Sequence, residues 1–185
     1  MPRIILGSLA AAIAMFIVGF IFYATPLVRF SYATLGNTQA ATVQQALAAN
    51  LPKTGTYFVP NPDESSEQTV MYGQGPIATI HYNRGGFAAM DTGALVGGLV
   101  LNFIVALLIG SALIGIDARV PDFASRARLV LIFSLAASAL MHLGGPLFYH
   151  HDWPHAIYAF IADAATLAVA GLVIARWFLP RGVKP

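Results

Sequence analysis

The sequence contains no cysteine and few charged residues. The absence of cysteine from all 185 residues excludes disulfides, thiolate metal sites and cysteine-ligated iron–sulfur clusters. Only 10% of the residues are charged, whereas soluble domains carry about 25%. A shortage of this size indicates that lipid, rather than water, surrounds much of the folded chain.

Several functional signatures are also missing. The formal net charge is +2 and the basic residues are scattered, so there is no polybasic run for nucleic acid. The chain has no nucleophile elbow (G-x-S-x-G), no H-E-x-x-H zinc motif, no Walker loop and no dinucleotide fingerprint. These absences favour a non-enzymatic protein and exclude nucleic acid as an expected partner.

Four long apolar runs are present instead. About 20 helical residues at 1.5 Å rise cross a hydrocarbon core of roughly 30 Å, and the runs predict transmembrane helices at 1–25, 92–116, 129–148 and 155–178. The first run, with Arg3 before it, has a secretory signal peptide as its alternative. Because its apolar stretch is long and ends without a convincing A-x-A site, we expect a retained span.

The segment 26–91 differs in kind, since it holds most of the Asn, Gln and Thr. A helix is predicted from Asn37 or Thr38, as the capping residue, to Leu51. Short strands are predicted at 56–59, 69–72 and 77–82, separated by Pro- and Gly-rich turns. The expected fold is therefore an all-α transmembrane four-helix bundle with a small α+β extracytoplasmic insertion between helices 1 and 2.

The basic residues predict the orientation. A link at 117–128, a loop at 149–154 and a tail at 179–185 complete the chain, and one side collects Arg3, Arg119, Arg126, Arg128, Arg176, Arg181 and Lys184. By the positive-inside rule this side is cytoplasmic. We therefore expect both termini in the cytoplasm of a bacterial cell, and the insertion and the 149–154 loop in the periplasm.

Three polar residues lie within the predicted spans: Asn102, His142 and Asp163. At helical rise all three fall between the outer surface and the middle of the membrane, so Asp163 and His142 can satisfy each other. One interpretation is a proton relay or a ligand and ion site. The other is a polar clasp that fixes how the helices pack.

A second cluster, His150, His151, Asp152 and His155, occupies the outer loop and the predicted start of the fourth span. Imidazole and carboxylate suit zinc or copper, and His151 and His155 are four residues apart. The alternative is an interfacial loop anchored by Tyr149 and Trp153. Bis-histidine haem is not expected, because only His142 lies clearly within a span.

The order of motifs resembles a group of bacterial inner-membrane proteins without assigned activity. The resemblance rests on an L-P-x-x-G-x-Y-F-x-P stretch, a G-P strand and a W-P turn, which here are Leu51, Pro52, Gly55, Tyr57, Phe58, Pro60, Gly75, Pro76, Trp153 and Pro154. It implies a bacterial cytoplasmic membrane and supplies no functional residues.

Three classes of function remain open. The first is an accessory, assembly or interaction subunit, whose small-residue faces around Gly93, Gly97 and Gly110 pack against other membrane subunits or a second copy. The second is a metal- or haem-binding membrane protein that uses the histidine loop. The third is a small oligomeric proton-coupled transporter built on Asp163 and His142.

Overall fold

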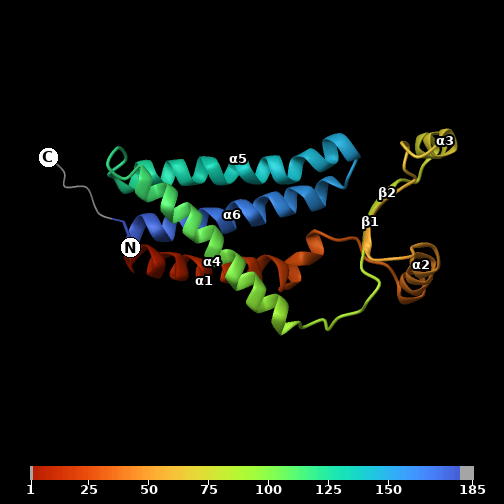
Figure 1. The fold of residues 1–185 in the computed structure, drawn as a ribbon, viewed down its shortest axis with the longest axis horizontal. Coiled ribbons are helices and arrows are strands. Elements are labelled where there is room, and N and C mark those ends of the chain that lie inside the picture. The colour runs from red at the N-terminus through yellow and green to blue at the C-terminus, as the bar shows by residue number, and fades with distance from the viewer. Residues whose placement is uncertain (1, 180–185) are drawn as a thin grey trace. The chain divides into compact units, whose positions relative to one another are not determined.

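The computed structural model describes residues 2–179, which form six α-helices, one 3₁₀ helix and a two-stranded sheet. In chain order these are α1 (Pro2–Tyr23), η1 (Pro26–Phe30), α2 (Asn37–Asn50), β1 (Gly55–Val59), α3 (Ser66–Gln74), β2 (Ala78–Tyr82), α4 (Thr92–Gly115), α5 (Phe123–Tyr149) and α6 (Trp153–Trp177) (Figure 1). Two compact units are present, and residues 34–91 form the second. Residues 26–33, which we expected in the insertion, belong to the first unit.

The first unit contains four helices that are long and apolar enough to cross a membrane: α1, α4, α5 and α6. This confirms the four predicted spans and a mostly helical fold with a small sheet. The protein is therefore an integral membrane protein, and the apolar side chains on the outside of these helices contact lipid.

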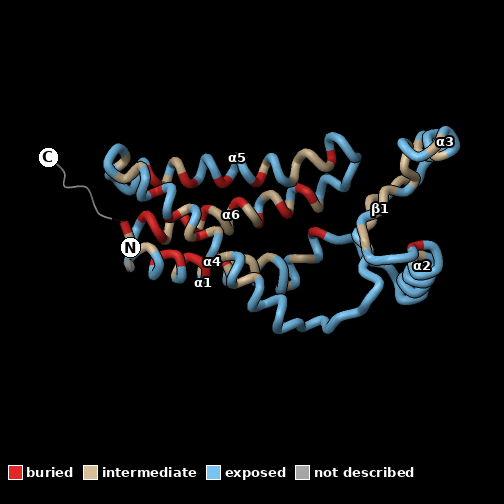
Figure 2. Tube along the Cα trace, in the orientation of Figure 1, coloured by how far each residue is buried: buried red, intermediate tan, exposed pale blue. Residues whose placement is uncertain are grey.

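Helix α6 lies at the centre of the first unit, since it packs against α1, α4 and α5. The buried side of α6 consists mostly of small residues, among them Ala156, Ala159, Ala162, Ala170, Gly171 and Ala175. Figure 2 shows buried positions recurring along α6 and α1. In a membrane, small side chains let helix backbones approach closely and gain van der Waals contact, which explains why α6 can hold three neighbours.

The glycines differ in how they are used. A Cβ on Gly171 of α6 would lie 2.6 Å from both Cγ atoms of Val130 of α5, so that crossing needs glycine. On α4, a Cβ on Gly110 would lie 2.9 Å from the Ile4 Cδ1 atom of α1, whereas a Cβ on Gly97, Gly98 or Gly115 would meet nothing within 4 Å. Few residues of α4 are buried, so most of the surface of this helix is open to lipid or to a partner.

Helix α5 is longer than predicted at both ends. It begins at Phe123 instead of Leu129, because the Asp122 carboxylate caps it by accepting a 2.9 Å hydrogen bond from the Ser125 amide. It also continues through Pro146 to Tyr149, one residue beyond the expected end at 148. Pro146 has no N–H to donate to the His142 carbonyl, and the helix tolerates this loss.

The cap of α5 provides a pH-dependent prediction. Hydrogen bonds from the Ser125 backbone and hydroxyl hold the pKa of the Asp122 carboxyl below its ordinary value. A lowered folded-state pKa stabilises the helix start above the unfolded-state pKa, near pH 4, and this contribution is lost as the pH falls through the folded-state pKa. We expect the protection factor of the Ser125 amide against hydrogen exchange to fall over that range, and Asp122→Asn, which caps without titrating, to remove this pH dependence of the protection factor.

The second unit contains α2, α3 and an antiparallel hairpin in which Gly55 pairs with Tyr82 and Val59 with Ala78. The hairpin confirms two predicted strands. The strand predicted at 69–72 was wrong: these residues lie in α3, whose first turn is capped by the Ser65 hydroxyl, which accepts a hydrogen bond from the Gln68 amide. The N-cap of α2 is Gly36, with no side-chain cap, rather than Asn37 or Thr38.

Candidate intramembrane site

Asp163 and His142 form the one ion pair found among residues 2–179. The Asp163 Oδ2 and His142 Nε2 atoms are 2.6 Å apart. Asp163 is ten residues into α6, and His142 is seven residues before the end of α5. At helical rise, Asp163 therefore lies roughly 15 Å from the start of α6 and His142 roughly 10 Å from the end of α5. The pair therefore lies well inside the membrane-spanning part of the unit.

The pair is not sealed inside the protein. The side chain of Asp163 is 32% exposed and that of His142 is 22% exposed. Ionisable groups within a membrane are costly unless they pair or face a polar cavity. The His142 contact satisfies one carboxylate oxygen, while the exposed part of Asp163 needs a polar environment of its own.

That environment is a pocket of about 350 Å³ between α1, α4 and α6, with Asp163 in its wall. Most of the lining is apolar, including Phe16, Phe20 and Leu101, but four polar side chains join it. They are Tyr23, Asn102, Asp163 and Thr166. A largely apolar cavity with a few convergent polar groups is the usual form of a small-molecule site.

The polar groups of this pocket differ in their availability. Thr166 Oγ1 donates to the Ala162 carbonyl of its own helix at 2.8 Å. The Asn102 amide has no hydrogen-bond partner within the described part of the chain. Asn102 and Asp163 are therefore the groups most able to bind something that enters the pocket.

The structure brings two of the three polar residues predicted inside the membrane into direct contact and places the third in a shared pocket. Asp163 contacts His142, on α5, and shares the pocket with Asn102, on α4. His142 itself does not line the pocket. Asp163 therefore connects the His142 imidazole of α5 with the pocket between α1, α4 and α6.

Two aromatic residues that the sequence did not single out, Tyr23 and Tyr158, hold α1 against α6 beside this site. The Tyr158 hydroxyl donates to the Phe22 carbonyl at the end of α1. Its ring lies edge-on to the rings of Phe22 and Tyr23, with centroids 5.8 Å and 6.1 Å away. These contacts place Tyr23 in the wall of the pocket that Asp163 also lines. Depth along the helices did not indicate them, because Tyr23 ends α1 and Tyr158 is only five residues into α6, whereas Asp163 is ten residues into α6.

The outer histidine cluster has a different arrangement. Asp152 caps α6, with its Oδ2 atom accepting a 2.9 Å hydrogen bond from the His155 amide. The His155 Nδ1 atom is 2.8 Å from the Ser31 hydroxyl, and its ring is 5.1 Å from that of Tyr32. His155 therefore joins the start of α6 to the segment that follows η1.

His150 and His151 have other roles. His150 ends α5 in the left-handed conformation, with φ of 54°. His151 stacks on Tyr149 at 5.6 Å and packs on Gly145, where a Cβ would lie 2.8 Å from its Nδ1 atom. Because α6 begins at Trp153, His151 and His155 do not share a helix face. Over residues 2–179 no three His, Cys, Asp or Glu side chains are arranged to hold a metal ion.

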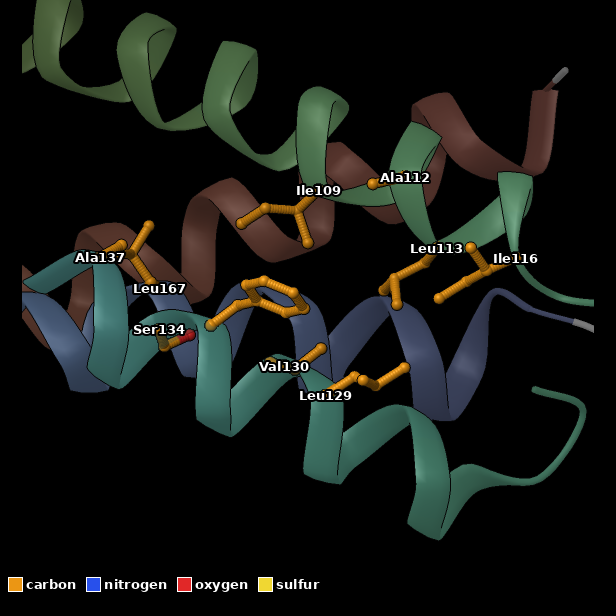
Figure 3. Close-up of a pocket in the computed structure, with 10 residues that line it drawn as sticks. Ile109, Ala112, Leu113, Ile116, Leu129, Val130, Ser134, Ala137 and Leu167 are labelled. Carbon is orange, nitrogen blue, oxygen red and sulfur yellow. The ribbon is translucent and has the colours of Figure 1, made fainter. Parts of the chain in front are cut away.

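A second cavity separates α4 from α5, and Figure 3 shows the side chains that line it. Its volume is about 390 Å³, and it is lined by Ile109, Ala112, Leu113, Ile116, Leu129, Val130, Phe133, Ser134, Ala137 and Leu167. Ser134 is its only polar side chain. The cavity therefore offers no charge to a polar ligand, and the candidate site is the pocket at Asp163.

Comparison with known proteins adds no relative from which a role could be transferred. No protein-family model, no curated protein and no solved structure matches this chain.

Proposed function

We propose that this protein is a small proton-coupled carrier in which the Asp163–His142 pair binds the proton. One observation carries the proposal: Asp163 bonds His142 on one side and lines a pocket with Asn102 on the other. A ligand in this pocket and a proton on the pair would therefore act on the same carboxylate. Four spans are few for a carrier, so we propose that it works as an oligomer.

Charge accounts for the coupling. With one proton the pair is net neutral, whether the proton lies on the imidazole or on the carboxylate. Loss of that proton leaves a single negative charge inside the membrane, which is strongly unfavourable. A cationic group in the pocket beside Asp163 would restore neutrality, so the site favours exchange of a proton for a small cation or amine.

The proposed location is the bacterial cytoplasmic membrane, with both termini in the cytoplasm. The positive-inside rule supports this orientation, because Arg3, Arg119, Arg126, Arg128 and Arg176 all flank the same ends of the spans. Arg181 and Lys184, which add to the pattern, lie outside the described residues. Residues 34–91 would then form a periplasmic domain. The bacterial origin rests on the resemblance in the motifs around Tyr57 and Trp153.

Proton flux in proteoliposomes tests the proposal. We expect purified full-length protein to carry protons down an imposed pH gradient when a small cation is supplied on the opposite side for exchange, measured with an enclosed pH-sensitive dye, and Asp163→Asn to reduce this flux at least about tenfold, as for loss of an acid–base group. Asparagine keeps the size of the side chain and can still bond His142. Asp117→Asn, outside the spans, is the matched control. Undiminished flux in Asp163→Asn protein would refute the proposal.

A second candidate function, an accessory or interaction subunit, is favoured by the open face of α4. A Cβ on Gly97 or Gly98 would meet nothing within 4 Å, and small residues on an open helix face suit close packing against another membrane helix. A stable complex that is lost in Gly97→Leu protein, together with no proton flux in the wild type, would favour this function over the carrier.

A further inference from the structure

A pocket with two arginines lies where α1 begins and α6 ends. Its volume is about 460 Å³, and its lining consists of Arg3, Leu6, Arg176, Trp177, Phe178 and Leu179. The arginines come from different helices, so helix packing brings them together. The pocket combines cationic groups, an indole and apolar side chains.

The packing around this pocket is specific. A Cβ on Gly7 of α1 would lie 2.7 Å from the Phe178 Cγ atom, so glycine at this position allows the ring to pack against α1. Leu179, which is 7% exposed, belongs to the hydrophobic core of the helices. The Arg176 guanidinium lies over the Phe123 ring of α5, 5.5 Å from its centroid. These contacts hold Arg176 beside the start of α1.

The two arginines are not neutralised by the described part of the protein. No carboxylate of residues 2–179 forms an ion pair with Arg3 or Arg176, and none lines the pocket. The Asp122 carboxylate, at the same end of the spans, accepts its hydrogen bond from the Ser125 amide. The pocket therefore has two positive charges available for an anion.

We propose that this pocket binds the phosphate headgroup of an anionic phospholipid. Guanidinium groups match phosphate oxygens in a bidentate geometry, and basic pockets between membrane helices recognise anionic headgroups. Trp177 suits the headgroup level of a bilayer. Leu6 and Phe178 provide apolar contact for the glycerol and upper acyl chain, which a free phosphate ion would leave unused.

The proposal depends on these helix ends lying at the membrane surface and not on the role of Asp163. A surface position for Arg3 and Arg176 follows from the length of α1 and α6, which are both able to cross the membrane. The proposed cytoplasmic orientation would place the pocket in the leaflet whose surface is rich in anionic lipid.

Lipid retention by the purified full chain tests the proposal. After incubation in detergent with equimolar phosphatidylglycerol and phosphatidylcholine, native mass spectrometry should show preferential retention of phosphatidylglycerol. We expect retention to fall roughly fivefold for each arginine replaced in Arg3→Gln and Arg176→Gln protein. Arg29→Gln, in η1 beyond the other end of α1, is the matched control and should bind as the wild type does.

Further variants and a competitor make the result decisive. The Arg3→Lys, Arg176→Lys double variant keeps both charges and should retain most of the binding, which separates a loss of charge from a loss of fold. Equal retention of both lipids by the wild type, or unchanged lipid preference in the Arg3→Gln, Arg176→Gln double variant, would overturn the proposal. Displacement of phosphatidylglycerol by inorganic phosphate at the same concentration would also overturn it. Asp163→Asn protein should retain lipid normally, so a failure of the carrier proposal is distinguishable.

Discussion

Replacement of Gly171 by valine is expected to separate α5 from α6 and to destabilise the protein by roughly 3 kcal/mol, the upper range for overpacking a core. Even the first added carbon would lie 2.6 Å from both Cγ atoms of Val130 and 3.1 Å from its Cβ atom. Val130 is 8% exposed, and a β-branched side chain in a helix has essentially one rotamer. It therefore cannot move aside, and the helices must part.

Thermal unfolding in detergent, followed by circular dichroism, measures this effect. Gly97→Val is the matched control, because its Cβ would meet nothing within 4 Å, and it should change stability little. Adding Val130→Gly to Gly171→Val exchanges the two side chains across the crossing at constant volume and should recover part of the loss. If the Gly171→Val and Gly97→Val variants unfold together, the close α5–α6 crossing does not exist.

Replacement of Asp163 by leucine is the second change with a large expected effect. It leaves the His142 imidazole, 22% exposed, without its partner inside the membrane. We expect a loss of about 1–2 kcal/mol, near the upper limit measured for hydrogen bonds between membrane helices. The double variant with His142→Leu should recover much of this loss, because it removes both polar groups together.

A double-mutant cycle on thermal stability isolates the pair. The cycle compares Asp163→Leu, His142→Leu and their combination with the wild type, and Asp163→Asn serves as the control that keeps a hydrogen-bonding side chain. Additive losses within measurement error would show that the two residues act independently, which contradicts the contact at 2.6 Å.

The spans could be predicted from the sequence because hydrophobicity over some 20 residues is a property of each segment alone. The run at 92–116 became α4 (Thr92–Gly115) almost unchanged. The start of α5 was less visible, since Phe123 to Arg128 is too polar to join an apolar run, although Asp122 before it is a good cap.

The wrong strand at 69–72 has a local cause. Thr69, Val70 and Tyr72 favour strands, but the stretch Ser65-Ser66-Glu67-Gln68 before them fits the S-x-x-Q pattern that starts helices. Gly75, at φ of 69°, ends the helix. The helix-start and helix-stop residues therefore outweighed the β-propensity of this stretch, and both signals were present in the sequence.

The histidine loop shows the limit of spacing arguments. A separation of four residues aligns His151 and His155 only if both lie in one helix. Because Asp152 caps α6 between them, His151 packs beside Tyr149 and His155 bonds Ser31, which is 124 residues away in sequence. Nothing near these histidines in the chain indicates Ser31 as a partner.

By itself, the sequence determined which segments lie in lipid and how deep each polar residue lies, because length, hydrophobicity and helical rise are local properties. Only the tertiary structure decided that Asp163 bonds His142 and shares a pocket with Asn102. Those contacts depend on the rotation of each helix about its axis, and that rotation follows from the packing of Gly171, the alanines of α6 and the side chains across from them.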